Sequence, residues 1–236
     1  RFPLFGDEVR IKAALDRHPN LRAASDVVHS DSVVDGSDKP SVAIRKKSSS
    51  MAMAIAAVKA GDAGAAVSAG NTGALMAMAK LALRTMPGVD RPALAAMLPT
   101  LGDNDAIMLD LGANVDSEPE HLLQFALMGQ ALVNAVDGVR HPRVALLNIG
   151  EEDIKGNEQI KDAAALLRDA PNINYAGFIE GDGIFAGEAD VVVCDYGYPN
   201  EAASVVEQVE SLGGKFVDTG TPPQAESSGG YAKETS

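Results

Sequence analysis

The sequence predicts an α/β domain with a Rossmann-like, mainly parallel sheet and flanking helices. Apolar stretches of strand length alternate with helix-like stretches along most of the chain, and this alternation is typical of parallel sheets. Three of the apolar stretches end in turns rich in Gly, Asn and Asp, at residues 68–74, 110–116 and 148–156. Aromatic residues make up only 4% of the chain, and small apolar side chains suit helices that pack closely on a sheet.

In the first third of the chain, amphipathic and apolar patterns predict helices and short strands. One of Ser48, Ser49 and Ser50 is expected to cap a helix that Gly61 ends, because hydroxyls accept from free amides at a helix start and glycine adopts the left-handed conformation at its end. The expected elements are a helix at 7–17, a strand at 21–29, a loop at 30–41, a helix up to residue 60, a strand at 64–68 and a helix at 75–83.

The middle of the chain continues the alternation, and its end changes character. Pro171 is expected to end one helix, because proline cannot continue a helical hydrogen-bond ladder. The last 18 residues are rich in Gly, Ser, Pro and Glu, a composition typical of a mobile tail. The expected elements are strands at 93–98, 106–111, 143–147, 174–180, 190–195 and 215–217, a hairpin turn at 102–105, and helices at 118–135, 157–168 and 201–212.

The composition excludes several classes of protein. The net charge of −13 argues against non-specific binding to nucleic acid. The single cysteine, Cys194, lies in an apolar run, so we expect a buried structural thiol and no disulfide. The four histidines are scattered without metal-ligand spacing, so no metal site is expected. No signal peptide or membrane-spanning run is visible, which favours the cytoplasm.

The turn Ser68–Ala74 has the composition of an anion site. A strand that leads through small residues into a helix collects free backbone amides and the positive end of the helix dipole at one place. The expected phosphate ligands are Ser68, Gly70, Asn71, Thr72 and Gly73. Since ligands of open α/β sheets bind at the carboxyl ends of strands, the three turns together predict one composite site. Ordinary strand-to-helix turns would have a similar composition.

Long stretches of residues 41–195 resemble one family. They include PSVAIRKKSSSMAMAI, VSAGNTGALMAMAK, GVDRPALAAMLPT, IMLDLGANVD, FALMGQ, PRVALLNIGEEDIKGNEQIKDAA and NINYAGFIEG. In these stretches the chain resembles the bacterial acyl-[acyl-carrier-protein]:phosphate acyltransferases. The resemblance implies transfer of an acyl group from acyl-carrier protein (ACP) to inorganic phosphate in phospholipid synthesis, without a cofactor. It also implies a fold similar to the isocitrate and isopropylmalate dehydrogenases, a homodimer, and peripheral contact with the inner membrane surface.

The same resemblance marks candidate residues for the chemistry. Phosphate is itself the nucleophile, so the protein has to hold phosphate and stabilise the oxyanion that forms at the thioester carbonyl. Asn114 and Asn148 are candidate oxyanion donors, and Lys155 is a candidate cation for phosphate or the leaving thiolate; a solvated lysine at a helix start is the alternative. The candidate acid, base or orienting groups are Asp110, Asp116 and Glu151, which helix capping would also explain.

A short basic run and both ends of the chain complete the sequence predictions. Arg45 and Lys47 match family positions and are candidates for docking the acidic ACP, although a solvated loop has the same composition. The family begins with a further strand and departs from this chain after Asp195. We therefore predict an incomplete acyltransferase-like domain at 1–195, a divergent segment at 196–236, and weak or absent turnover.

Two other hypotheses follow from the residues. The segment from Ala202 to Ser236 faintly resembles alanine dehydrogenases and transhydrogenase alpha subunits, which suggests an NAD(P)-binding fragment. Against this, we expect no helix between the Gly181–Gly183 turn and the strand that follows, whereas a dinucleotide fingerprint needs one. The other hypothesis is a non-catalytic module that binds an anion or ACP.

Overall fold

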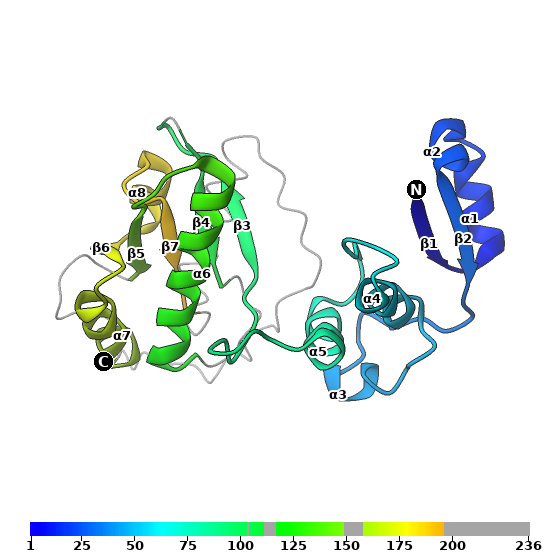
Figure 1. Cartoon of the computed structure of the whole chain (residues 1–236), viewed down its shortest axis with the longest axis horizontal. Helices are drawn as coiled ribbons and strands as arrows, with labels where there is room; N and C mark the ends of the chain where they lie inside the picture. The colour runs from blue at the N-terminus through cyan, green and yellow to red at the C-terminus, as the bar shows by residue number, and fades with distance from the viewer. Residues whose placement is uncertain (103, 111–116, 149–157, 196–236) are drawn as a thin grey trace, which may run out of the picture.

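The computed structural model describes residues 1–102, 104–110, 117–148 and 158–195. The described chain forms a five-stranded sheet with its helices and, joined to it by residues 84–94, a smaller part with a two-stranded sheet and a helical cluster (Figure 1). The predicted helix at 201–212, the predicted strand at 215–217 and the predicted tail lie outside the described residues.

The smaller part contains two parallel strands and five helices in the described residues. Asp7 caps its first helix by accepting from the amide of Arg10 at 2.8 Å. Ser49 is the serine that caps the fourth helix, and Gly61 ends that helix with φ 82°. The elements are β1 (Phe2–Gly6), α1 (Glu8–Leu15), α2 (Pro19–Ala24), β2 (Ser25–His29), α3 (Pro40–Ala43), α4 (Ser50–Ala60) and α5 (Thr72–Leu83).

The five-stranded sheet is mainly parallel, as the alternating sequence pattern predicts. Its strand order is β3-β4-β7-β5-β6; β3 and β4 form an antiparallel hairpin, and the other pairs are parallel. The elements are β3 (Ala95–Leu98), β4 (Ala106–Leu109), α6 (Pro119–Asp137), β5 (Arg143–Leu147), α7 (Glu158–Asp169), β6 (Asn174–Ile179), α8 (Gly181–Ala186) and β7 (Val191–Val193).

Alternating side chains of these strands build two cores. On one face, Ile107 and Leu109 of β4 pack with Phe125 of α6 and with apolar residues of α7. On the other face, Met108 packs in a cluster with Ile184 and other residues of β3, β5, β7 and α8. This alternation follows from the two-residue period of a strand. A third, smaller core lies among α3, α4 and α5.

Two expected elements differ from the structure. Residues 64–68 are not a strand, and Val67 is 95% exposed. A strand needs a hydrogen-bonded neighbour, but a groove of about 880 Å³ lies between β1 and residues 62–69. A helix, α8, does stand between the Gly181 turn and β7, because Ile184 and Phe185 bury its apolar side. The expectation of no helix there was wrong.

Three further elements were not expected in this form. Residues 21–24 belong to α2, which Pro19 begins, and only 25–29 form the expected strand. The first strand, β1, and the single-turn helix α3, which Pro40 begins, were missed. Each is four to six residues long, which is too short for a hydrophobic period to show.

Candidate functional site

The carboxyl ends of three adjacent strands each lead to a buried polar residue. Asp110 follows β4, Asn148 follows β5, and Asp195 comes two residues after β7, which lies between the other two strands. The three residues are 1%, 4% and 6% exposed. Such an edge of a parallel sheet is where ligands of α/β proteins bind. The structure therefore brings the predicted Asp110 and Asn148 to one edge of one sheet.

Hydrogen bonds fix the backbone at this edge. The amide of Leu94 donates to Oδ1 of Asp110 at 3.1 Å, which ties the start of the β3 segment to the end of β4. The amide of Asn148 donates to the carbonyl of Ile179 at 3.0 Å. These two hydrogen bonds tie Asp110 and Asn148 to neighbouring segments of the sheet.

Cys194 lies beside this edge but has the properties of a structural thiol. Its Sγ donates to the carbonyl of Asp110 at 3.1 Å, and the residue is 5% exposed. Burial, with the nearby charges of Asp110 and Asp195, raises the pKa of the Cys194 thiol to about 12. A thiol with that pKa carries almost no thiolate at neutral pH and is a poor nucleophile, in agreement with the sequence prediction.

Four other predicted residues of this edge lie outside the described residues: Asn114, Asp116, Glu151 and Lys155. In the sequence, the segments that carry them come after Asp110 (111–116) and after Asn148 (149–157).

The Ser68–Gly73 turn begins α5 in the smaller part of the molecule, not at the end of a strand of the five-stranded sheet (Figure 1). Ser68 Oγ accepts from the amide of Gly70 at 3.2 Å. A Cβ on Gly70 would lie 3.2 Å from Cε of Met51, so the turn packs closely on α4. Thr72 is half-buried and Gly73 is exposed. The predicted phosphate ligands are contiguous, and the structure does not join them to the Asp110 edge.

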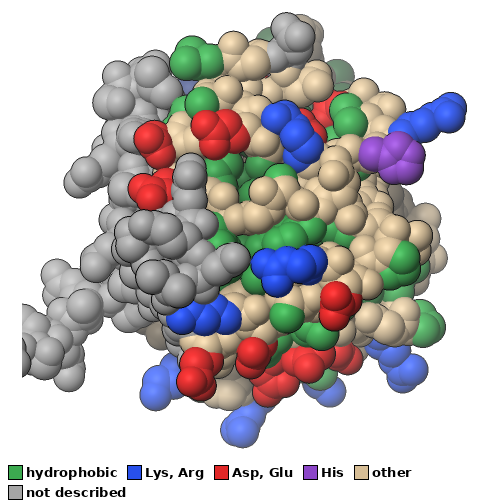
Figure 2. Space-filling view, turned by 90° about the vertical axis from the view of Figure 1, so that its left-hand side faces the viewer, with side chains coloured by type: hydrophobic (Ala, Val, Ile, Leu, Met, Phe, Trp, Pro, Cys, Tyr) green, Lys and Arg blue, Asp and Glu red, His purple; other side chains and the backbone are tan. Residues whose placement is uncertain are grey.

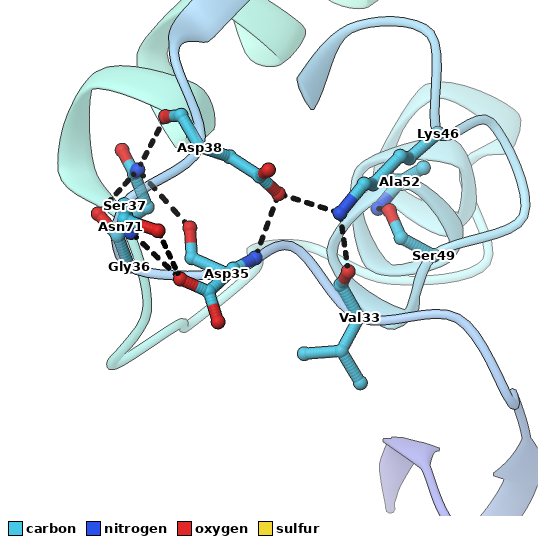
Figure 3. A network of polar contacts seen from close by, with 9 residues as sticks. All are labelled: Val33, Asp35, Gly36, Ser37, Asp38, Lys46, Ser49, Ala52 and Asn71. Carbon is cyan, nitrogen blue, oxygen red and sulfur yellow. Dashed lines mark hydrogen bonds and ion pairs between the residues drawn. The ribbon is translucent and has the colours of Figure 1, made fainter. Parts of the chain in front are cut away.

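Asn71 is the centre of a polar network that connects this turn to residues 33–38 and to Lys46 (Figure 3). Its Oδ1 accepts from the amide of Ala74 at 2.8 Å and so caps α5. Its Nδ2 donates to the carbonyls of Asp35, Gly36 and Asp38 at 3.3, 3.0 and 2.9 Å. The carboxamide thus binds two segments that are far apart in sequence.

Charged groups complete the network. Lys46 Nζ donates to Oδ2 of Asp38 at 2.6 Å and to the carbonyl of Val33 at 3.1 Å. The hydrogen bond from Lys46, and a second one from the amide of Asp35, lower the pKa of the Asp38 carboxyl. Hydrogen bonds from the hydroxyl and amide of Ser37 likewise lower the pKa of Asp35. Both carboxylates are therefore charged near neutral pH.

The basic run divides into two roles. Arg45 and Lys47, the predicted docking residues, are exposed, whereas Lys46 between them is turned toward Asp38. Two exposed cations on one short turn remain accessible to an acidic partner, while the cation between them is committed to the protein's own loop.

Two residues of these regions were missed by sequence reasoning. Asp195 follows the buried run Val191–Cys194 and carries the same signal that identified Asp110 and Asn148, a polar residue directly after an apolar strand. Lys46 carried no separate signal, because its partner Asp38 lies in a loop whose path the sequence does not reveal.

Among the described residues, α7 and β6 contain no predicted site residue. Figure 2 shows the face that includes α7 and β6, where charged side chains of both signs are spread and acidic ones gather along one rim. A shallow pocket of about 400 Å³ there is lined by Arg168, Ile173, Tyr175 and the neighbouring β6 backbone.

Over the described ranges, no three His, Cys, Asp or Glu residues come together as metal ligands. In the same ranges, no helix has the length and apolarity to cross a membrane.

Comparisons with known proteins identify relatives by sequence. A family model described as "Fatty acid synthesis protein" matches residues 1–218. A phosphate acyltransferase of Erythrobacter litoralis is 55% identical over 210 residues, covering 88% of this chain and 59% of that protein. One of Alcanivorax borkumensis is 59% identical over 209 residues, covering 87% and 60%. The chain thus spans about three fifths of the length of these curated relatives.

Solved structures show a related fold at low sequence identity. The EutD phosphotransacetylase of Staphylococcus aureus has a TM-score of 0.56 and 16% identity, over 89% of this chain and 73% of that one. A phosphotransacetylase of Streptococcus pyogenes has a TM-score of 0.54 and 14% identity, over 90% and 82%. At such identities the likeness concerns the fold alone.

Proposed function

The chain belongs to the fatty acid synthesis protein family, and on that premise we propose that it acts as a phosphate acyltransferase on acyl-ACP. Relatives that are more than half identical carry the name phosphate acyltransferase, and this observation carries the proposal. An oxygen of inorganic phosphate attacks the thioester carbonyl, the carbon–sulfur bond breaks, and the thiolate takes up a proton. The products are acyl phosphate and free ACP.

The edge formed by Asp110 and Asn148 is proposed to serve the acyl-transfer step. Asn148 is 4% exposed at the end of β5, and a buried carboxamide can donate to the developing oxyanion without competing water. Asp110 orients backbone through Leu94 and is proposed to orient the neighbouring donors as well. Asn114 is proposed as a further oxyanion donor, Lys155 as a cation for phosphate or the leaving thiolate, and Asp116 and Glu151 as acid, base or orienting groups.

The turn Ser68–Gly73 is proposed to bind inorganic phosphate. The small residues and the start of the twelve-residue helix α5 support this assignment, because amides and the helix dipole favour an anion there. For phosphate to react with a thioester held at the Asp110 edge, the Ser68–Gly73 turn and this edge must contact the two substrates in one active site during turnover.

Arg45 and Lys47 are proposed to dock ACP. Both are exposed on the turn that precedes α4, and a local basic patch can steer an acidic partner to a chain of net charge −13. We further propose, on the resemblance, a homodimer, a cytoplasmic location with peripheral membrane contact, and a fold similar to the isocitrate and isopropylmalate dehydrogenases.

The decisive experiment traps the product. The purified chain is incubated with palmitoyl-ACP and phosphate, and acyl phosphate is captured by hydroxylamine as the hydroxamate. We expect hydroxamate to form only when phosphate is present.

Each other outcome decides between the hypotheses. A folded chain that binds ACP but forms no hydroxamate supports the non-catalytic module and contradicts the proposal. Binding of NAD(P)H, measured by fluorescence titration, would support the dinucleotide hypothesis. The family match does not favour that hypothesis.

A further inference from the structure

The Asn71 carboxamide is already fully engaged within the protein. A carboxamide has two N–H groups, and those of Asn71 are directed at three carbonyls of residues 35–38, at 2.9 to 3.3 Å. Its oxygen accepts from the amide of Ala74. A side chain that donates to phosphate must turn an N–H away from such acceptors, at the cost of leaving carbonyls unpaired.

We infer that Asn71 is a positioning residue: it ties the 35–38 loop to the first turn of α5 and thereby sets the shape of the Ser68–Gly73 turn. This inference rests on the proposed phosphate site in that turn. It assigns direct contact with phosphate to the neighbours of Asn71, namely the Ser68 hydroxyl and the amide of Gly73, and assigns Asn71 to their placement.

Asp38 connects this tether to the basic run. Its carbonyl accepts from Asn71 at 2.9 Å, while its carboxylate accepts from Lys46 at 2.6 Å and from the amide of Asp35 at 2.8 Å (Figure 3). Lys46 in turn donates to the carbonyl of Val33. The loop is therefore held from α5 on one side and from the turn before α4 on the other.

Because Asp38 is negatively charged, the direction in which its removal changes phosphate affinity tests the inference. A carboxylate near an anion site repels phosphate, so by Coulomb's law alone its removal would tighten phosphate binding. If Asp38 instead holds the loop that Asn71 grips, its removal weakens binding. Loss of affinity on removal of a negative charge is thus evidence for positioning.

The experiment measures phosphate affinity and loop order together. Calorimetry with inorganic phosphate and hydrogen exchange of the Asp35, Ser37 and Asp38 amides are compared in the wild type, N71A, N71D and D38A. N71D keeps an oxygen to cap α5 but has no N–H for the carbonyls, so it separates the tether from the cap and serves if N71A folds poorly.

Two variants are matched controls. N134A removes an Asn that donates to a single carbonyl, that of Val139, at the end of α6. D31A removes an exposed carboxylate near the loop that pairs with His29. Neither touches the network, so both should keep wild-type phosphate affinity and wild-type exchange of residues 35–38.

We expect N71A and D38A each to weaken phosphate binding about tenfold, and N71A, N71D and D38A each to speed exchange of the loop amides. N71D adds a negative charge that by itself weakens phosphate binding, so for this variant the exchange decides. Weaker binding by N71A with unchanged exchange would make Asn71 a direct ligand and overturn the inference, as would tighter binding by D38A.

If the wild type binds no phosphate, the proposed phosphate site fails, and loop exchange still decides the tether. Unchanged exchange in N71D overturns the inference, whereas faster exchange leaves the tether standing without the phosphate role.

Discussion

Asp190 is the side chain that joins the amino ends of neighbouring strands. It accepts from the amide and guanidinium of Arg143 at 2.6 to 3.2 Å, and its carbonyl accepts from the amide of Ile107. D190A should lower the free energy of unfolding by about 2 kcal/mol, typical of hydrogen bonds to a charged group. Urea denaturation measures this, with D26A, which breaks an exposed pair, as a control that should cause no measurable change.

The contribution of Asp190 should depend on pH. Burial raises the pKa of Asp190, but hydrogen bonds from the side chain and backbone of Arg143 outweigh it and leave the pKa below the ordinary value of 3.8. A lowered folded pKa stabilises the folded state at pH values above 3.8 and loses this contribution as the pH falls through the folded pKa. The difference between wild type and D190A should shrink below pH 3.8 and stay constant above pH 5; a constant difference at all pH values would contradict the assignment.

Cys194 should resist alkylation in the folded chain. It is 5% exposed and burial raises its pKa to about 12, whereas an unfolded cysteine has a pKa near 8.5. With iodoacetamide at pH 8, mass spectrometry should find the native thiol at least about a hundredfold slower than the same thiol in urea, because thiolate is the reactive form. Comparable rates in both states would show that the thiol is accessible and active.

Sequence reasoning at the residue scale succeeded where one local pattern decides the outcome. Asp110 and Asn148 lie at the carboxyl ends of two apolar strands as expected, and Gly61 ends a helix as expected. The catalytic roles of Asp110 and Asn148 stay a prediction. The hydrogen bonds of Asn71 could not be found in this way, since its partners lie 33 to 36 residues away. The motif marked the residue, and only the folded loop shows what its carboxamide contacts.

At the element scale, the close approach of α6 to the sheet depends on Gly129. A Cβ there would lie 2.5 Å from Cγ1 of Val191 and 2.7 Å from Cδ1 of Leu109. G129A should therefore destabilise the chain by about 1–2 kcal/mol, because overpacking costs more than the gain of about 1 kcal/mol in helix propensity. Thermal unfolding shows whether G129A stabilises or destabilises the chain. A131G, at an exposed position of the same helix, measures the effect of helix propensity without a change in packing. Stabilisation by G129A would show that α6 shifts freely.

The elements themselves were predictable in proportion to their length and to their independence of neighbours. The strand β5 and the helices α6 and α7 agree with the sequence prediction to within two residues at each end. The expected strand at 64–68 failed because a strand exists only beside a partner, and β1 is separated from it by the groove. The helix α8 was missed because its six residues are fewer than two helical turns.

At the scale of the whole molecule, the link between the two parts depends on Gln124. Its Nε2 donates to Oδ2 of Asp90 at 2.7 Å, and its Oε1 accepts from the amide of Asp90 at 2.8 Å. The carbonyl of Asp90 accepts from Lys80 of α5 at 2.7 Å. Asp90 therefore joins α5, the segment 84–94 and α6. This junction could not be predicted from the sequence, because its three members lie on separate elements.

Loss of this junction should expose the connecting segment to proteolysis. Q124A removes both hydrogen bonds to Asp90 but leaves the apolar packing of α6 on the sheet unchanged. Local opening of residues 84–94 should therefore cost less free energy than in the wild type. Two hydrogen bonds of about 1 kcal/mol each imply that trypsin should cleave after Arg84 roughly thirtyfold faster. N134A, another polar side chain of α6 that does not contact this segment, should leave cleavage unchanged. Equal cleavage of Q124A and wild type would show that the two parts are held together by other contacts. Faster cleavage would show that the hydrogen bonds between Gln124 and Asp90 keep residues 84–94 closed against α6.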